Sequence, residues 1–258
     1  MSSWIRVLGT VVGAGACLWA ASAQAWGNPH AAPRPPRVGV LLYGAGMMDG
    51  SEVQEAVLTL LALDRAGAQI VPIAPSGNQA EVVNHQTGAA VAAEQRNMLV
   101  EAARLSHGGV VPLDSVQPED LDALVIPGGL GFVKSVTTFG KDGASFSYDP
   151  ALGQLLTDLH RQRKPLGFLC ITPLLAAKLF GAEHPRLTIG GDAGMVAVME
   201  GLGARPVPAT AEEAVVDEEA RLVSSPAYKV GPSVSHVAVG IEEAVARVLE
   251  LIRSSHHH

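Results

Sequence analysis

Short apolar runs alternate with amphipathic stretches along the chain from residue 37 onward. Residues 38–43 form a continuous apolar run that ends in Gly44-Ala45-Gly46, which is typical of a buried parallel strand followed by a loop. The next apolar positions have the spacing of one helix face: Val53, Ala56, Val57, Leu60 and Leu61. Gly67 would end that helix.

The same two patterns recur toward the C-terminus. They predict further strands at residues 69–74, 121–126, 166–170 and 186–189, and further helices at 98–105, 150–163, 174–180, 195–202 and 241–252. Residues 81–92 are expected to form a small β excursion around a turn, and residues 215–224 a hairpin. Strands that alternate with helices favour one α/β domain, in which a mainly parallel sheet carries helices on both faces.

In a sheet of this kind the functional site lies at the carboxyl ends of the strands. Three predicted strand ends carry unusual residues, at positions 44–52, 127–131 and 170–173. We expect these three segments to converge.

The N-terminal segment has the parts of a secretory signal peptide. Arg6 supplies a positive charge, residues 7–20 are apolar, and Ala23-Gln24-Ala25 has the small residues of a cleavage site. An uncleaved membrane anchor and a lipoprotein attached at Cys17 are the alternatives. The expected organisation is a signal peptide at 1–25, a Pro-rich linker at 26–36, one domain at 37–253 and a tail at 254–258. The mature protein would be periplasmic or secreted without stable membrane association, and cytoplasmic if the signal is not used.

Composition narrows the classes of function. Hydrophobic residues make up 48% of the chain and charged residues 17%, which suits a sizeable core. The formal net charge of −7 does not suit a protein that binds nucleic acid. The histidines before the C-terminal run lack the spacing of metal ligands, so we expect neither a metal nor a cofactor. Removing residues 1–25 would leave Cys170 as the only thiol.

Cys170 lies between a predicted strand and a predicted helix, followed by Ile171, Thr172 and Pro173. Thr172 suits an N-cap and Pro173 the first helical position. A sharp strand-to-helix turn projects its central side chain, as in a nucleophile elbow, and the helix N-terminus would favour the thiolate. The alternative is a small apolar side chain buried at a strand end.

A second candidate is Glu52 in Asp49-Gly50-Ser51-Glu52, which resembles a capping box with Asp49 as N-cap and Glu52 at N3. Capping alone would explain the pattern. The same geometry also points Glu52 over the strand ends, where Cys170 is expected. A carboxyl group beside a thiol in a partly dry pocket would have a raised pKa and could move a proton near neutral pH.

The third element is Pro127-Gly128-Gly129-Leu130-Gly131, which follows a predicted buried strand. The N–H groups of Gly128, Gly129 and Ile171 could stabilise an oxyanion on an adduct of Cys170. A phosphate or dinucleotide site is not expected, because neither a G-x-G-x-x-G nor a Walker pattern is present.

Five segments together resemble the ElbB-like branch of the DJ-1/PfpI superfamily, whose members are similar to class I glutamine amidotransferases: Asp49-Gly50-Ser51-Glu52, Asn84-His85-Gln86-Thr87-Gly88, Pro127-Gly128-Gly129, residues 167–173 and Ser225-Pro226-Ala227-Tyr228. The resemblance spans residues 37–252. It implies a flavodoxin-like three-layer sandwich, a homodimer, and a Cys nucleophile with a nearby Glu, which correspond to Cys170 and Glu52. ElbB-like proteins are described as glyoxalases that need neither glutathione nor metal, and some relatives as protein deglycases.

The chain departs from the superfamily pattern where a His is expected. Ile171 follows Cys170, and the predicted strand at 186–189 leads into Gly190-Gly191-Asp192. We therefore expect a Cys170–Glu52 dyad instead of a triad. Asp192 could be a third polar member or a helix N-cap, and His85 could be catalytic or could stabilise its turn.

These observations predict a cofactor-independent glyoxalase-type enzyme that converts small 2-oxoaldehydes of the glyoxal class to 2-hydroxy acids through a hemithioacetal on Cys170. A small aldehyde would be its only partner besides a second copy of the chain. The alternative is a non-enzymatic redox-sensing or chaperone-like dimer in which Cys170 is oxidised reversibly. Hydrolysis of an amide, as in amidotransferases, is disfavoured by the missing His.

Overall fold

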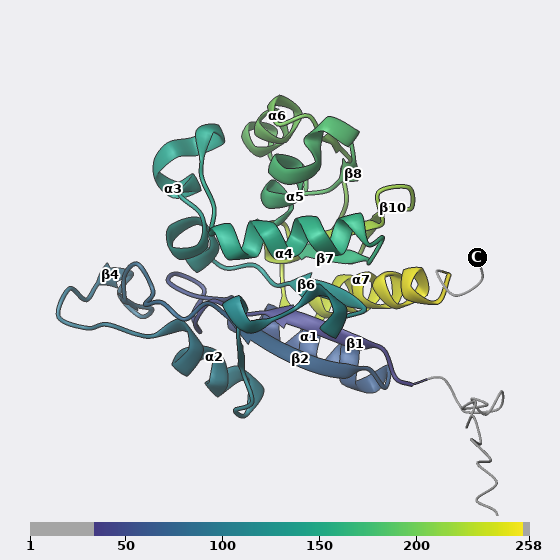
Figure 1. The fold of residues 1–258 in the computed structure, drawn as a ribbon. Coiled ribbons are helices and arrows are strands. Elements are labelled where there is room, and N and C mark those ends of the chain that lie inside the picture. Colours follow the sequence, from purple (N-terminus) through teal and green to yellow (C-terminus); the bar gives the residue numbers. More distant parts are fainter. Residues whose placement is uncertain (1–33, 255–258) are drawn as a thin grey trace, which may run out of the picture. The chain divides into compact units, whose positions relative to one another are not determined.

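A parallel sheet organises residues 34–254, which are the residues that the computed structural model describes. Seven strands lie in the order β10–β11–β7–β6–β1–β2–β5, and neighbouring strands are parallel except for the antiparallel pair β10–β11. Their bounds are β1 Arg37–Leu41, β2 Gln69–Ala74, β5 Val111–Pro112, β6 Ala123–Ile126, β7 Leu166–Leu169, β10 Val215–Asp217 and β11 Leu222–Ser225. The predicted α/β sandwich with a mainly parallel sheet is confirmed (Figure 1).

Helices cover both faces of this sheet, because alternate side chains of each strand point to opposite faces. Val38 and Val40 of β1 pack in one apolar cluster with α1 Val53–Arg65, α2 Met98–Ser106 and α7 Val234–Ser254. Leu41 belongs to the cluster on the other face, with α3 Phe139–Asp142, α4 Pro150–Arg161, α5 Pro173–Phe180 and α6 Ala193–Gly201. Both clusters are mainly aliphatic, and each fully buried Leu or Val contributes about 1.5–3 kcal/mol.

Two small sheets lie outside the main one. The small β excursion predicted at 81–92 is present as an antiparallel pair, β3 Val83–Asn84 and β4 Ala89–Ala90. The predicted strand at 186–189 is only β8 Arg186–Leu187, and it pairs with β9 Arg205–Pro206 instead of joining the main sheet. The closing helix α7 begins at Val234, seven residues before its predicted start.

The buried face of α1 differs from the predicted one. Val53, Val57 and Leu61 are exposed, with 40%, 45% and 38% of their surface accessible. Ala56 of the predicted stripe is buried, and Leu60 packs partly buried against the core. The other buried positions are Glu55, Thr59, Ala62 and Leu63. Helix α1 therefore turns a carboxyl group and a hydroxyl group toward the sheet.

The three strand ends converge as predicted. The Glu52 N–H before α1 donates to the Gly128 carbonyl after β6 at 2.8 Å, and the Gly131 N–H donates to the Gly50 carbonyl at 3.1 Å. A side-chain carbon built on Gly128 would lie 2.3 Å from Cβ of Cys170. The glycine loop therefore lies between the start of α1 and the turn that follows β7.

Candidate active site

Cys170 occupies a strained turn directly after β7. Its φ of 59° is in the left-handed region, which costs a residue with a side chain about 1–3 kcal/mol. The turn is fixed because the Cys170 N–H donates to the Ser225 carbonyl of β11 at 2.9 Å. Cys170 is half-buried, between the strand and α5. This is the nucleophile-elbow geometry that the sequence predicts.

The acid beside the thiol is Glu55, on the first turn of α1. Glu55 is completely buried, and its carboxyl group is hydrogen-bonded to the thiol of Cys170. Its Oε2 accepts from the Gly128 N–H at 2.6 Å, and its Oε1 accepts from the Tyr228 N–H at 3.2 Å. A side-chain carbon on Gly128 would lie 2.6 Å from Glu55 Oε2 and 2.9 Å from Cys170 Sγ. Glycine at 128 leaves the room that this pair needs.

Glu52, the predicted partner of Cys170, lies elsewhere. It is the N-cap of α1, and its Oε2 accepts from the Glu55 N–H at 2.6 Å. Its carboxyl group is therefore turned back onto the helix end, and it is half-buried there. Because the helix begins at Val53, the N3 acid that faces the site is Glu55. The structure thus corrects the expected Cys170–Glu52 pairing to a Cys170–Glu55 contact.

Burial controls the ionisation of this pair. Desolvation raises the pKa of Glu55 to about 7, although the N–H groups of Tyr228 and Gly128 favour its carboxylate. Desolvation, followed by the charge and hydrogen bond of Glu55, raises the pKa of the Cys170 thiol well above its ordinary value. The Lys229 ammonium and the Ile171 N–H oppose this rise. The expected bias toward the thiolate of Cys170 is therefore wrong in direction. A state in which Cys170 and Glu55 are both deprotonated is disfavoured, because the two negative charges repel each other in a buried site.

The predicted oxyanion donors differ in their availability. The Gly128 N–H is already bonded to Glu55, so it is not free for a substrate oxygen. The Gly129 N–H has no acceptor within residues 34–254, and Gly129 has a φ of +121°. The Ile171 N–H points at the Cys170 sulfur. Gly129 and Ile171 remain the predicted oxyanion donors.

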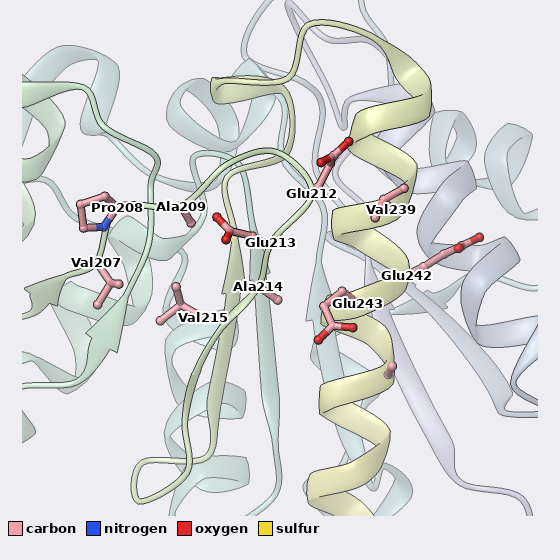
Figure 2. A pocket seen from close by; sticks show the side chains of 11 residues that line it. Val207, Pro208, Ala209, Glu212, Glu213, Ala214, Val215, Val239, Glu242 and Glu243 are labelled. Carbon is pink, nitrogen blue, oxygen red and sulfur yellow. The ribbon is translucent and has the colours of Figure 1, made fainter.

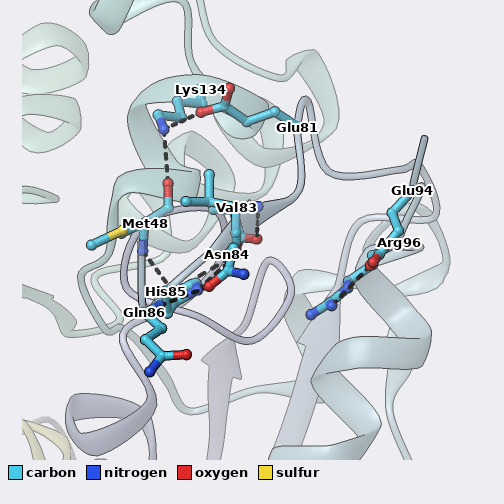
Figure 3. A network of polar contacts seen from close by, with 10 residues as sticks. Met48, Glu81, Val83, Asn84, His85, Gln86, Glu94, Arg96 and Lys134 are labelled. Carbon is cyan, nitrogen blue, oxygen red and sulfur yellow. Dashed lines mark hydrogen bonds and ion pairs between the residues drawn. The ribbon is translucent and has the colours of Figure 1, made fainter. Parts of the chain in front are cut away.

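Asp192 and His85 make no bond to Cys170 or Glu55. Asp192 is the exposed N-cap of α6, and its Oδ1 accepts from the Met195 N–H at 2.8 Å. The His85 Nδ1–H donates to the Val83 carbonyl at 3.0 Å, and its Nε2 accepts from the Met48 N–H at 3.1 Å (Figure 3). The imidazole therefore ties the β3–β4 hairpin to the loop before α1. Both contacts match the structural alternatives for these residues.

Three residues near Cys170 were given no role from the sequence. Tyr43 is fully buried, and its hydroxyl donates to the Pro127 carbonyl at 2.5 Å. Burial first, and then the charges of Glu55 and Cys170, raise the pKa of Tyr43 well above its ordinary value. Tyr228 ends the segment Ser225-Pro226-Ala227-Tyr228, which the resemblance includes without assigning it a role, and Lys229 follows it.

An open groove of about 670 Å³ lies away from this site (Figure 2). It is bordered by residues 207–215 and by α7, and four glutamates line it: Glu212, Glu213, Glu242 and Glu243. None of the predicted site residues lines this groove. Within the described residues, no group of three or more His, Cys, Asp or Glu side chains is arranged to hold a metal ion. The helices of residues 34–254 include none that is long and apolar enough to span a bilayer.

Comparisons with known proteins identify the relatives of the chain. No family model matches it. The mitochondrial ES1 protein homolog of Rattus norvegicus is 35% identical over 231 residues, which cover 85% of this chain and 86% of that protein. The mitochondrial glutamine amidotransferase-like class 1 domain-containing protein 3 of Homo sapiens is 34% identical, over 85% of each chain.

Two solved structures share the fold. An isoprenoid biosynthesis protein with an amidotransferase-like domain from Ehrlichia chaffeensis has a TM-score of 0.78 at 32% identity and covers 84% of this chain and 99% of its own. A ThiJ/PfpI domain protein from Brachyspira murdochii has a TM-score of 0.51 at 12% identity, over 84% of this chain and 96% of its own, which shows the fold alone. The protein is a member of the DJ-1/PfpI superfamily, and the predicted resemblance to that superfamily is confirmed. Within it, the chain belongs to the family of ES1 and glutamine amidotransferase-like class 1 domain proteins.

The comparisons overturn the predicted location. Three relatives, from Rattus norvegicus, Homo sapiens and Danio rerio, are named as mitochondrial proteins, so the prediction of a periplasmic or secreted protein is wrong. Residues 1–25, on which that prediction rests, lie outside the described residues. The first 34 residues contain Arg6 and Arg34 but no acidic residue. Signal peptides and mitochondrial presequences share this charge bias, so it does not distinguish the two addresses.

Proposed function

We propose that the protein is a cofactor-independent glyoxalase-type enzyme that converts small 2-oxoaldehydes to 2-hydroxy acids. The observation that carries this proposal is the contact between the Cys170 thiol and the buried carboxyl group of Glu55, whose pKa is raised to about 7. A nucleophile and a group that can take up and return a proton near neutral pH are the two functions that this isomerisation needs.

The reaction begins when the sulfur of Cys170 adds to the aldehyde carbon and the thiol proton passes to the aldehyde oxygen, which gives a hemithioacetal. The Glu55 carboxylate then removes the proton of this carbon, which gives an enediolate. The hydroxyl proton moves from the oxygen of this carbon to the oxygen of the neighbouring carbon, and Glu55 returns its proton to that neighbouring carbon. The product is a thioester of a 2-hydroxy acid. Water hydrolyses the thioester, which restores the thiol, so the net change is the addition of one water molecule to the substrate.

The backbone around the pair supports this sequence of steps. The Gly129 N–H has no acceptor within the described chain, and it would stabilise the oxygen that becomes negative in the enediol and in thioester hydrolysis. The Ile171 N–H stabilises negative charge on the sulfur. The Gly128 and Tyr228 N–H groups hold the Glu55 carboxyl group in place.

The test is turnover of glyoxal and methylglyoxal by residues 37–258, with formation of glycolate and lactate followed by NMR. We expect Cys170→Ala to abolish turnover and Glu55→Gln to lower kcat at least 100-fold, which is typical for loss of a general base. Glu52→Gln is the matched control, because Glu52 caps the same helix without contacting the thiol. Equal turnover by Cys170→Ala would contradict the proposal.

The other candidate functions have less support. Glutamine hydrolysis, which the relatives' names suggest, uses a His to protonate the leaving amine, and within residues 34–254 no His is bonded to Cys170 or Glu55. Redox sensing favours a thiolate at neutral pH, whereas the pKa of the Cys170 thiol is raised. Ammonia release from glutamine, or a sulfinic adduct after mild peroxide treatment, would revive these alternatives.

A further inference from the structure

A cation without an anionic partner lies at the edge of the candidate active site. Lys229 is half-buried, and its ammonium makes no hydrogen bond or ion pair with residues 34–254. Two other basic side chains of the domain are paired, Lys134 with Glu81 and Arg65 with Glu242. The charge of Lys229 is therefore not neutralised by the described residues, and it is available to a ligand.

The backbone fixes Lys229 next to the Cys170–Glu55 pair. Lys229 ends a short 3₁₀ turn that begins at Ala227, which is fully buried and has a φ of 44°. The segment is held on one side by the bond from Cys170 to the Ser225 carbonyl, and on the other by the bond from the Tyr228 N–H to Glu55. A second residue with left-handed backbone therefore lies beside the strained Cys170, and such strain is concentrated at functional sites.

The nearby carboxyl groups do not neutralise Lys229. Glu55 is directed at Gly128, Tyr228 and the thiol, and the Glu52 carboxyl group is turned toward the Glu55 N–H. Neither forms an ion pair with the lysine. The ammonium is nevertheless close enough to the sulfur to favour its negative charge. A negatively charged group on a molecule attached to Cys170 would meet the same ammonium.

We propose that Lys229 binds an anionic group of the substrate, so that the preferred substrate is a 2-oxoaldehyde that also carries a carboxylate or phosphate group. This inference rests on the proposed function for the reaction that the substrate undergoes. The preference of Lys229 for an anionic group does not depend on that reaction and can be measured without it. Lys229 is thus a specificity-determining residue, distinct from the Cys170–Glu55 pair that performs the chemistry.

The first test compares two alkylating reagents that react with the same sulfur. Iodoacetate is anionic and iodoacetamide is neutral, so the ratio of their rates at one pH reports the charge preference and cancels any change in thiol ionisation. We expect Lys229→Met to lower the iodoacetate-to-iodoacetamide ratio about fivefold, as for a partly screened charge pair. Lys229→Arg and the exposed control Lys141→Met should keep the ratio. A ratio that Lys229→Met leaves unchanged would overturn the proposal.

The second test compares kcat/KM for 4,5-dioxopentanoate, a 2-oxoaldehyde with a carboxylate, and for neutral methylglyoxal. We expect Lys229→Met to lower the ratio of these two values about tenfold, whereas Lys141→Met should not change it. An equal effect on both substrates would overturn the specificity role. If no variant consumes either aldehyde, the proposed function fails, and the alkylation ratio still decides whether Lys229 selects anions.

Discussion

Glu55 combines two environments that act on its pKa in opposite directions. Two backbone N–H groups donate to its carboxyl oxygens and favour the charged form. Complete burial favours the neutral form and is the larger effect, so the pKa is raised to about 7. A carboxyl group with this pKa can accept and return a proton at neutral pH. This property distinguishes Glu55 from an acid that only caps a helix.

The first prediction concerns the titration of Cys170. Burial raises the pKa of the thiol most, and the charge of Glu55 and its hydrogen bond raise it further. Glu55→Gln removes the charge. We expect the midpoint of the Cys170 alkylation rate against pH to move to lower pH in this variant. The measurement is the iodoacetamide rate from pH 6 to pH 10, with loss of the Cys170 peptide followed by mass spectrometry.

Glu52→Gln is the control for that titration. Glu52 does not contribute to the shift of the Cys170 pKa, so the midpoint should stay where it is in the unchanged protein. Loss of the N-cap carboxylate should cost about 0.5–1 kcal/mol of stability. A midpoint that rises in Glu55→Gln would mean that Glu55 acts mainly as a donor to the thiolate, contrary to our assignment.

At the scale of elements, the glycine loop after β6 is the part that tolerates least change. A side-chain carbon at position 128 would lie 2.3 Å from Cβ of Cys170 and 2.6 Å from Oε2 of Glu55. We expect Gly128→Ala to separate the pair, to abolish turnover and to cost about 1–3 kcal/mol of stability, as overpacked sites do. Urea unfolding and the turnover assay measure the two effects.

Gly191→Ala is the matched control for this substitution. Position 191 has no atom within 4 Å of an added side-chain carbon, so its stability should change by less than about 0.5 kcal/mol. If Gly128→Ala retained full turnover, the close contact between the loop and the pair would have no functional importance.

The apolar pattern predicted the strands of the sheet but not the residue at which α1 begins. Apolar runs bounded by glycine predicted the strands and therefore the convergence of their ends, because parallel strands bring their carboxyl ends to one edge. The pattern could not fix where α1 begins. Starting the helix at Asp49 made Glu52 the N3 acid, whereas the helix begins at Val53 and places Glu55 there. The turn after β7 that carries Cys170 agrees with the sequence pattern, whereas the acid that contacts the thiol lies three residues after the predicted one.

The pattern of apolar residues also predicted the buried face of α1 only in part. A hydrophobic stripe predicts burial only when apolar contacts decide the orientation of a helix. Here the buried side includes Glu55 and Thr59, and Thr59 satisfies its hydroxyl by donating to the Glu55 carbonyl at 2.7 Å. The Glu55 carboxyl group lies on the inner face of the helix, and Val53, Val57 and Leu61 remain exposed. No pattern of apolar residues could reveal this exchange.

At the scale of the whole molecule, the exposed row on α1 provides a surface for the predicted homodimer. Val53, Val57 and Leu61 are four residues apart, and such rows interdigitate when two helices cross. A two-fold axis near Val57 would place Val53 of one copy opposite Leu61 of the other. We propose that a second copy of the chain covers this row.

Sedimentation of the domain tests this arrangement. We expect a dimer for residues 37–258 and a monomer for Val57→Glu, because the substitution would bury a charge at the two-fold axis. Val100→Glu changes another exposed valine, 60% accessible and on α2 outside the row, and should remain dimeric. A monomer at all concentrations for the unchanged domain would contradict the proposal.

The last prediction links the site to the stability of the fold. The pKa of Glu55 is about 7 in the folded protein and near 4.5 when the group is exposed. Between these values the folded state holds a proton that the unfolded state releases, so the free energy of unfolding must decrease as the pH rises. This contribution is complete below the unfolded pKa and is lost as the pH passes the folded pKa. From pH 4.5 to pH 8 the loss is about 3 kcal/mol, since one pKa unit corresponds to about 1.4 kcal/mol.

Glu55→Gln tests this contribution, because glutamine has no proton to release. The free energy of unfolding of this variant, measured with urea, should not show this decrease with pH. The difference in free energy of unfolding between the two proteins should therefore change by about 3 kcal/mol from pH 4.5 to pH 8. Parallel profiles for both would show that Glu55 is ionised in the folded protein at low pH, and the proton-transfer role assigned to it would then be wrong.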